Sequence, residues 1–277
     1  MPGATYLDEI LAAKRAVAAA DDRNVAALVD RAAGRGPGRG FTRALVAAPG
    51  LAVIAEIKRR SPSAGQLAAD LDPAAVARDY EAGGAAALSV LSDERFFGGS
   101  AKDVTTAAAA CALPVLRKDF TVGEADVADA RLMGADAVLL IVAALSDTEL
   151  TALVALADRL GLDALVEAHD EGELERALRA GARLVGVNQR DLTTFAVDHD
   201  RALRVAGAVP DGVVAVAESG IRGPDDARRL VAAGYRAVLV GETFMRAADR
   251  RAAVAALAGT PTAVEAGEAV GRAGRGA

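Results

Sequence analysis

The sequence has few of the residues that build disulfides, zinc sites and base-stacking surfaces. It contains one cysteine (Cys111), two histidines and no tryptophan, and only 3% of its 277 residues are aromatic. A single cysteine cannot form an intrachain disulfide, and so few histidine and cysteine ligands make a zinc site unfavourable. Aromatic side chains that could stack on nucleic-acid bases are equally scarce. These shortages argue against a disulfide scaffold, a zinc protein and a single-strand binder.

Positive charge and long apolar runs are also lacking. The formal net charge is −6 and the sequence pI is about 5.1, whereas proteins that work on DNA or RNA usually carry the opposite balance. No apolar run approaches the roughly 20 residues that span a bilayer, and the first residues lack the basic-then-apolar order of a signal peptide. We therefore expect a cytoplasmic protein with no nucleic-acid or membrane partner.

The sequence does have a regular alternation of short apolar runs and longer amphipathic stretches. Eight runs have the length and composition of strands: Ala52–Ile57, Ala86–Val90, Val115–Lys118, Ala137–Val142, Ala164–Glu167, Leu184–Val187, Val213–Ala217 and Ala237–Val240. Most of them begin about 20–35 residues apart, the length of one strand–helix unit. Near-continuous apolar strands are typical of a parallel sheet covered by helices. Eight such units predict an α/β fold, a single closed (β/α)8 TIM barrel.

Capping signals mark the ends of several predicted helices between these strands. Asp72 followed by Pro73 offers an N-cap and a proline at the first helical position. Ser146 with Glu149 has the spacing of a capping box. Pro224 opens a further helix. Helices of this kind are expected on the outside of the barrel.

The chain divides into three predicted parts. Residues 1–50 form an N-terminal helical extension packed on the barrel, with one helix from about Leu7 to Lys14 and a second over Val25–Ala33. The pattern alone leaves open whether this extension plugs the bottom of the barrel or caps its mouth. The glycine-rich stretch Gly34–Gly40 predicts a mobile connector. Residues 51–259 form the barrel, and residues 260–277 are expected to be a disordered tail.

Charged and polar side chains occur where the predicted strands end, and this is where barrels of this kind carry their chemistry. Side chains alternate along a strand, so residues two apart face the same side. The residues concerned are Glu56, Lys58, Lys118, Glu167, His169, Asn188, Arg190 and Glu218. A buried charge is costly unless it is paired. The set therefore indicates either a ring of structural ion pairs or, as we favour, a cluster of acids and amines inside the barrel mouth.

Two smaller features carry alternative interpretations. Gly220 and Gly241 follow the seventh and eighth predicted strands, where backbone N–H groups of such barrels hold phosphate; either glycine alone could also be an ordinary turn. His169 is either a proton shuttle or a rim histidine hydrogen-bonded to a carbonyl.

At these residues the sequence resembles the indole-3-glycerol phosphate synthase family, which acts in tryptophan biosynthesis. The resemblance is carried by seven segments, in order across roughly residues 41–250: Ile54–Gly65, Ala87–Ser100, Pro114–Phe120, Leu165–His169, Gly186–Leu192, Ala217–Ile221 and Val240–Met245. Members are (β/α)8 barrels with extra N-terminal helices. The resemblance implies a lyase that closes a ring, with decarboxylation and dehydration, converting 1-(2-carboxyphenylamino)-1-deoxyribulose 5-phosphate into indole-3-glycerol phosphate without metal or organic cofactor.

The resemblance also implies catalytic roles. Lys118 is expected to be the general acid for ring closure, with its pKa lowered by partial burial and by nearby Lys58. Glu167 is expected to act in the dehydration, and Lys58 to share proton transfer there, so that the identity of the acid in this step stays open. Glu56 and Asn188 would orient Lys118 and the intermediate.

Binding roles follow in the same way. Ser61, Arg190 and Ser219 resemble substrate-contacting residues, and Glu218 matches an active-site glutamate. Gly220, Gly241 and the backbone of Glu242 would hold the phosphate, with the Glu242 side chain turned outward. The aromatic ring of the substrate would rest on a wall formed by Phe97, Phe120 and Leu139. Two positions depart from the family pattern: Ala64 stands where lysine is common, and Gln189 where asparagine is common.

Two rival functions remain. Phosphoribosylanthranilate isomerase would share the phosphate loops but would need a cysteine–aspartate pair near the first and fifth strands, and Cys111 precedes the third. A non-catalytic barrel could keep the glycines without keeping paired lysine and glutamate inside. The synthase explains both features, and its expected partner is one small phosphosugar–anthranilate molecule, bound by a monomer or weak homodimer.

Overall fold

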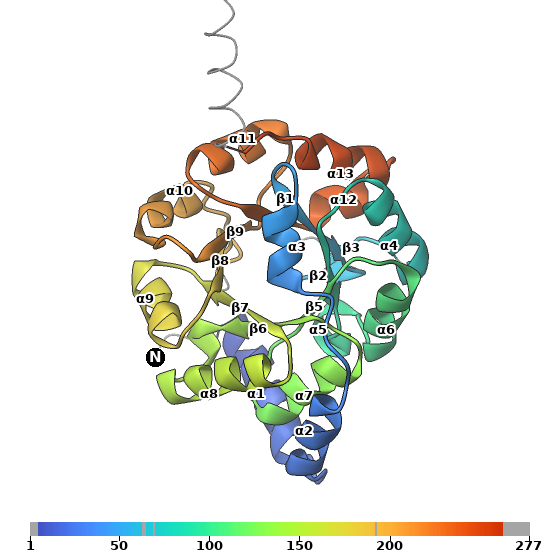
Figure 1. Ribbon diagram of the computed structural model, residues 1–277, viewed down its shortest axis with the longest axis vertical. Helices are drawn as coiled ribbons and strands as arrows, with labels where there is room; N and C mark the ends of the chain where they lie inside the picture. Colours follow the sequence, from blue (N-terminus) through green and yellow to red (C-terminus); the bar gives the residue numbers. More distant parts are fainter. Residues whose placement is uncertain (1–4, 63–64, 69, 192, 263–277) are drawn as a thin grey trace, which may run out of the picture.

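The computed structural model describes residues 5–62, 65–68, 70–191 and 193–262, and these form a closed barrel inside a ring of helices (Figure 1). Its eight strands are all parallel and neighbour one another in the order β1-β10-β9-β8-β7-β6-β5-β4. They are β1 (Ala52–Ile57), β4 (Ala87–Leu91), β5 (Val115–Lys118), β6 (Ala137–Ile141), β7 (Asp163–Ala168), β8 (Leu184–Asn188), β9 (Val214–Glu218) and β10 (Ala237–Val240). The predicted TIM barrel is therefore confirmed.

The predicted strands match the observed ones closely. Three have the predicted bounds, and the other five differ by one residue at one or both ends. In β7, β8 and β9 a polar residue, Asp163, Asn188 or Glu218, extends the hydrogen-bonded ladder by one position. Asn188 lies opposite Glu218 in the register of β8 and β9, and the apolar pattern that defines a strand in the sequence stops just before both residues. A strand ends where its pairing ends, and pairing does not depend on the polarity of the side chain.

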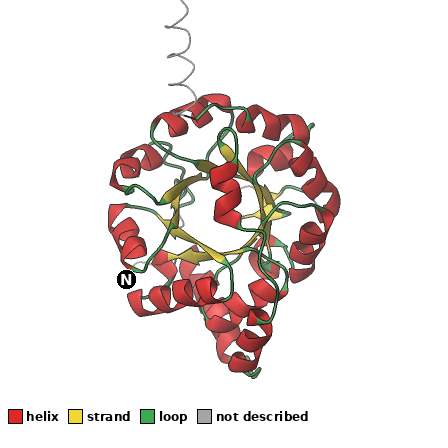
Figure 2. Ribbon diagram, in the orientation of Figure 1, coloured by secondary structure: helices red, strands yellow, loops and turns green. Residues whose placement is uncertain are grey.

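Helices cover the outside of the barrel (Figure 2). They are α4 (Pro73–Ala82), α5 (Glu94–Phe97), α6 (Ala101–Ala110), α7 (Glu124–Leu132), η1 (Val142–Ala144), α8 (Asp147–Arg159), α9 (Glu171–Arg179), α10 (Arg201–Val205), η2 (Ala206–Ala208), α11 (Pro224–Ala232), α12 (Glu242–Arg246) and α13 (Arg250–Ala258). The predicted caps are confirmed. Asp72 accepts from the N–H groups of Ala74 and Ala75, and Ser146 forms a capping box with Glu149. A short hairpin of β2 (Arg60–Ser61) and β3 (Gly65–Gln66) lies between β1 and α4.

The N-terminal extension contains α1 (Tyr6–Ala19), α2 (Val25–Ala33) and α3 (Phe41–Ala47), and its helices reach both ends of the barrel. Helix α3, which the sequence pattern did not predict, lies across one open end in Figure 1. That end is the bottom, because Thr42 N–H donates to Asp163 at the start of β7 (3.0 Å). Helix α1 lies at the other end, where Lys14 binds Asp93 after β4 and Asp119 after β5. Helix α3 therefore lies at the bottom of the barrel, and α1 contacts loops at its mouth.

The connector between α2 and α3 is anchored, contrary to the expectation of a mobile segment. Arg39 donates from its backbone N to Asp136 (2.7 Å) and from Nε to the same carboxylate (2.8 Å). Arg131 donates to the carbonyl of Gly36. Glycine content indicates that a backbone can be flexible, whereas these hydrogen bonds hold the connector in place.

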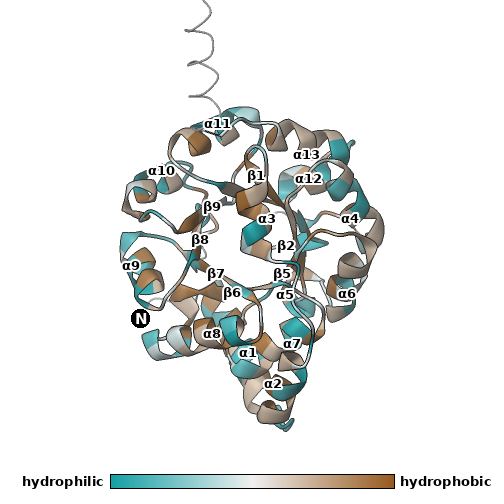
Figure 3. Ribbon diagram, viewed as in Figure 1, coloured by the Kyte–Doolittle hydropathy of each residue, from teal (hydrophilic) through white to brown (hydrophobic). Residues whose placement is uncertain are grey.

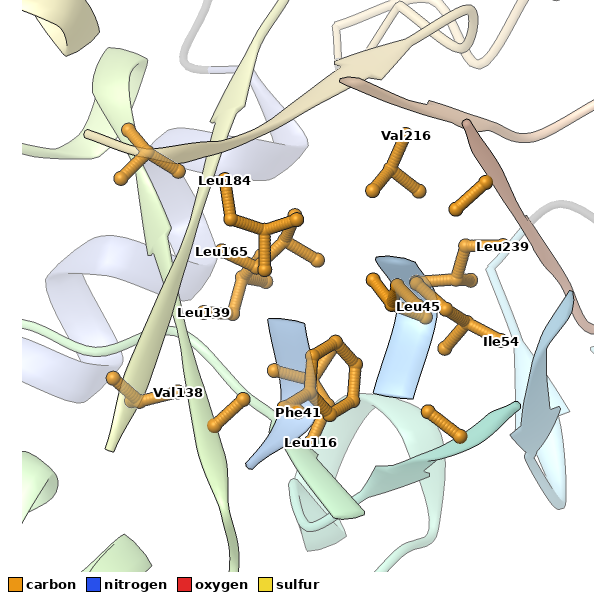
Figure 4. Packing of buried hydrophobic residues seen from close by; sticks show 14 of the residues in the cluster. Phe41, Leu45, Ile54, Leu116, Val138, Leu139, Leu165, Leu184, Val216 and Leu239 are labelled. Carbon is orange, nitrogen blue, oxygen red and sulfur yellow. The ribbon is translucent and has the colours of Figure 1, made fainter. Parts of the chain in front are cut away.

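The bottom of the barrel is filled with apolar side chains. Figure 4 shows Phe41 and Leu45 of α3 beside Leu116 and Ile54 of the strands, and all four are inaccessible to solvent. Hydrophobic residues line the strands, and hydrophilic ones lie mainly on the outer helices (Figure 3). Within the described residues no helix is long and apolar enough to cross a membrane. Ala64 and residues 263–277, which carry two of the expectations above, lie outside the described residues.

Candidate active site

A cavity of about 460 Å³ opens at the carboxyl ends of the barrel strands. Its size suits a small-molecule ligand. All fifteen residues singled out as catalytic or binding line it: Glu56, Lys58, Ser61, Phe97, Lys118, Phe120, Leu139, Glu167, Asn188, Arg190, Glu218, Ser219, Gly220, Gly241 and Glu242. They come from eight different strands or the loops after them. Closure of the barrel therefore brings together side chains that lie up to 186 residues apart in the sequence (Glu56 to Glu242).

Lys118 lies at the centre of the charged cluster. Its Nζ donates to Glu167 Oε2 (3.0 Å) and to Glu218 Oε2 (2.8 Å). Burial alone would lower the pKa of Lys118, but the charges of Glu167, Glu218 and Glu56 outweigh burial and raise it. The expected lowering of this pKa by Lys58 is therefore wrong, because the carboxylates around Lys118 dominate its environment. Lys118 is held as a cation.

Lys58 is occupied by a carboxylate of its own strand. Its Nζ lies 2.5 Å from Glu56 Oε1, as the alternation of side chains along β1 predicts. Gly241 makes room for this pair, because a Cβ at Gly241 would collide with the Glu56 carboxylate. Glu56 accepts a hydrogen bond from Lys58, and its negative charge also acts on Lys118.

Glu167 is held on both carboxylate oxygens. Lys118 binds Oε2, and Asn188 Nδ2 donates to Oε1 (3.0 Å). Asn188 thus reaches Lys118 through Glu167. Burial acts to raise the pKa of Glu167, but Lys118, His169 and Asn188 together lower it. Glu167 is a carboxylate in this arrangement.

Glu218 differs from Glu167 because one of its carboxylate oxygens has no hydrogen-bond partner among the described residues and its pKa is raised. Its Oε1 is buried and has no hydrogen-bond partner among the described residues. Gly186 on the neighbouring strand β8 provides the space, since a Cβ there would collide with this oxygen. Burial first, and then the negative charge of Glu167, raise the pKa of Glu218 despite its contact with Lys118. Two glutamates that share one lysine therefore differ in acidity, as acid and base partners do in many active sites.

The loops after β8, β9 and β10 form the opposite side of the cavity. Ser219 and Gly220 both have left-handed backbone conformations (φ 68° and 74°), and a Cβ at Gly220 would meet Val197 and His199. Gln189, whose side chain points away from the cavity centre, fixes this turn by donating to the Ser219 carbonyl (2.8 Å). The Glu242 side chain pairs with Arg246 (3.1 Å) on the surface. The backbone of these turns is thus presented to the cavity.

An apolar wall stands across from these loops. The rings of Phe97 and Phe120 lie 6.1 Å apart, and Leu139 lines the same cavity. Lys14 of α1 joins the two loops that carry the phenylalanines, because its Nζ lies 2.9 Å from Asp93 Oδ2 and 2.6 Å from Asp119 Oδ1. The N-terminal helix therefore helps to shape the cavity wall.

Sequence reasoning missed several residues of the cavity. They are Asp93, Asp119, Phe195, Val197, His199, Arg222, Thr243 and Arg246, among others. Asp119 had a usable signal, since it directly follows Lys118 within a conspicuous polar segment. Phe195 had none, because it lies in a loop without strand parity; its ring packs on Tyr6 of α1 (5.2 Å). No group of three or more histidine, cysteine, aspartate or glutamate side chains in the described part of the chain could hold a metal ion.

This geometry can perform proton transfer on a small anionic molecule. It offers the amines of Lys58 and Lys118 close to the carboxylates of Glu56, Glu167 and Glu218, an apolar wall for a flat ring, and exposed backbone turns for an anion.

Comparison with known proteins gives a consistent result. The family model described as indole-3-glycerol phosphate synthase matches residues 7–257. Indole-3-glycerol phosphate synthase 2 of Streptomyces coelicolor is 53% identical over 237 residues, which cover 86% of this chain and 92% of that protein. The indole-3-glycerol phosphate synthase of Mycobacterium avium is 48% identical over 258 residues, 93% of this chain and 95% of that protein.

More distant solved structures share the fold. A 3-hexulose-6-phosphate synthase superposes with a TM-score of 0.60 at 16% identity, covering 76% of this chain and 100% of the other. A thiamine phosphate pyrophosphorylase from Pyrococcus furiosus has a TM-score of 0.57 at 19% identity, covering 75% and 93%. At these identities the likeness concerns the barrel alone.

Proposed function

The chain belongs to the indole-3-glycerol phosphate synthase family, and on that premise we propose which of its side chains carry the reaction. It is a carboxy-lyase of tryptophan biosynthesis that turns 1-(2-carboxyphenylamino)-1-deoxyribulose 5-phosphate into indole-3-glycerol phosphate, carbon dioxide and water. The ring carbon that bears the carboxylate attacks the ketone, the carboxylate leaves as carbon dioxide, and the new hydroxyl group leaves as water. Each of the first and last steps needs an acid.

Lys118 is the acid of ring closure in this proposal. As the ring carbon attacks, the ketone oxygen becomes an alkoxide, which is a far stronger base than an amine. A lysine that is held protonated can therefore give up its proton to this oxygen even though nearby carboxylates raise its pKa. The observation that carries the assignment is the central position of Lys118 in the cavity, within hydrogen-bonding distance of both Glu167 and Glu218.

Glu167 is the base of the dehydration. It is the carboxylate whose pKa is lowered, so it is ionised and can accept the proton that must leave carbon. Lys58, which follows β1 and lines the same cavity, shares proton transfer to the departing hydroxide. Glu56 keeps Lys58 in place through its 2.5 Å contact.

The substrate fits the cavity in one direction. Its ring lies against Phe97, Phe120 and Leu139, and its phosphate against the turns at Ser219, Gly220, Gly241 and Glu242. Ser61 and Arg190, which line the space between, contact the polar groups of the sugar and the carboxylate. Backbone N–H groups and glycines suit a phosphate because they let the chain approach it closely.

We further propose that the protein works in the cytoplasm as a monomer or weak homodimer. All fifteen site residues come from one chain, so a monomer or weak homodimer is sufficient for activity. The single free thiol of Cys111 suits the reducing cytoplasm. Residues 1–50 act as the extension and residues 51–259 as the catalytic barrel.

Two variants and a control test these roles. Lys118→Met keeps the length of the side chain and removes its proton, while Glu167→Gln removes the charge of the base. The appearance of indoleglycerol phosphate is followed by its fluorescence, and binding of the product by equilibrium titration. Lys102 is exposed on α6, so Lys102→Met serves as the matched control. We expect turnover to fall by about 10³-fold or more in Lys118→Met and about 10²-fold in Glu167→Gln.

Product should still bind within a few-fold of the parent value in both variants. Equal losses of binding and turnover in Lys118→Met would argue that Lys118 holds the substrate rather than protonating it. Unchanged turnover in Glu167→Gln would remove Glu167 from the mechanism.

A further inference from the structure

His169 lies directly behind the active-site carboxylate Glu167. It follows Glu167 by two residues at the end of β7 and is mostly buried, with a side chain 14% exposed. Its Nδ1 lies 3.0 Å from Glu173 Oε2 on α9, and its backbone N–H donates to the same oxygen (2.8 Å). This differs from the expected hydrogen bond to a carbonyl. Its Nε2 lies 3.8 Å from Glu167 Oε1 and has no hydrogen-bond partner among the described residues.

These contacts restrict the protonation of the imidazole. An ionised glutamate can only accept a hydrogen bond, so Nδ1 must carry a proton toward Glu173. A neutral ring would then present the lone pair of Nε2 to the carboxylate of Glu167, and two acceptors would face each other in a buried place. A protonated ring instead presents Nε2–H to Glu167. The imidazolium is therefore the form that satisfies both neighbours.

Glu167 needs such a second cation during the reaction. In the free enzyme its charge is balanced by Lys118 at 3.0 Å. Lys118 also serves the ketone oxygen in the proposed mechanism, and once it turns to the substrate and gives up its proton, that balance is lost. Lys58 is already paired with Glu56. A buried carboxylate that loses its only cation takes up a proton and ceases to be a base.

We propose that His169 is a positioning residue that stays positively charged and holds Glu167 as an oriented carboxylate while Lys118 is engaged with the substrate. The inference rests on the proposed role of Glu167 in the dehydration. The proton that Glu167 takes from carbon then goes to the departing hydroxide, which forms water, and Glu167 returns to the carboxylate with His169 unchanged. Proximity of the imidazolium makes the protonated Glu167 a stronger acid for that second transfer.

The charges around His169 determine how its protonation, and with it the support of Glu167, depends on pH. Glu167 on β7 and Glu173 on α9 face it, and Arg201 on α10 is the nearby positive group. Burial acts to lower the pKa of His169, but the hydrogen bond to Glu173 and the charges of Glu167 and Glu173 raise it above its usual range. The cation is present below this raised pKa and is lost as the pH rises through it. Turnover should therefore decline on the alkaline side of that pKa.

The experiment combines a direct titration with pH–rate profiles. The chain has only two histidines, so the Cε1–H signals of the intact protein can be assigned by comparison with His169→Gln. One signal should titrate with a raised pKa, and this pKa should rise further when indole-3-glycerol phosphate is bound. Glu173→Gln should shift the same titration, and the alkaline decline of kcat, toward lower pH.

His169→Gln should lower kcat about tenfold with KM within about twofold, and should abolish the alkaline decline that tracks the His169 signal. A pH profile that is unchanged in His169→Gln, or a His169 signal with an ordinary or lowered pKa, would overturn the inference. Should His169→Gln fold poorly, the wild-type titration and Glu173→Gln still decide the matter. If the proposed role of Glu167 is itself wrong, Glu167→Gln will keep full turnover. That outcome can be told apart from a failure of the His169 inference, which is measured in His169→Gln and in the titration.

Discussion

The two ends of this barrel are built from the same eight strands and have opposite chemistry. At the bottom, Phe41 and Leu45 of α3 pack on strand residues such as Leu116 in a dry apolar core (Figure 4). At the mouth, two residues further along β5, Lys118 lies among buried carboxylates. The comparison shows how a barrel separates stability from function: the apolar end drives folding, and that stability lets the polar end carry charges whose burial is unfavourable.

The largest effect should come from emptying the bottom. Phe41→Ala removes a side chain that is inaccessible to solvent, and such a truncation leaves a cavity and costs about 3–5 kcal/mol of unfolding free energy. Because the mouth is left intact, kcat of the folded enzyme should not change. Denaturant unfolding and fluorescence turnover measure the two quantities. Val46→Ala on the same helix, where the side chain is 56% exposed, is the control. A matching fall in kcat would show that the two ends are coupled.

A smaller effect is expected from a methyl group added at the mouth, and it should fall on activity rather than on stability. In Gly241→Ala the new Cβ collides with the Glu56 carboxylate, which must move and release Lys58. We expect kcat/KM to fall about tenfold, or about 1.4 kcal/mol, with little change in stability. Gly207→Ala is the matched control, since nothing lies within 4 Å of its added Cβ. Unaltered kinetics in Gly241→Ala would mean that the Glu56–Lys58 pair does not contribute to turnover.

The smallest expected effect is on the stability that the folded protein loses when Glu218 at the mouth ionises. Glu218 has a raised pKa in the folded protein, so its ionisation opposes folding: stability falls as the pH rises from the ordinary range of a glutamate through the raised value. Glu218→Gln removes this loss and should stabilise the protein by about 1 kcal/mol at alkaline pH, while turnover falls. Thermal unfolding at several pH values is the measurement. Destabilisation at every pH would show that the carboxylate supports the fold.

Much of the mouth could be predicted because strand parity is local. Lys118 follows Leu116 by two residues, so both must face the barrel interior once β5 forms, and the same argument placed Glu56 beside Lys58. Partner choice could not be predicted in this way. Lys118 could have met Lys58 or any of several carboxylates, and only the stagger of the closed barrel brings it to Glu167 and Glu218.

The N-terminal extension likewise contains one helix that the sequence predicts and one that only the tertiary structure explains. The amphipathic stretch Val25–Ala33 was identified with its observed bounds, whereas the seven-residue helix Phe41–Ala47 was missed. A helix so short has little stability of its own. It exists because Phe41 and Leu45 are buried against the barrel, a contact that lies far away in the sequence.

The sequence by itself determined the order of strands and helices, the apolar interior, and the presence of acids and amines at the strand ends, because periodicity and spacing are local properties of the chain. Tertiary structure alone decided which charges meet, that the pKa of Lys118 is raised rather than lowered, that α1 reaches the mouth while α3 closes the bottom, and that His169 lies against Glu167. The reason is that electrostatic energies depend on distance and burial, and both are defined only when the barrel is closed.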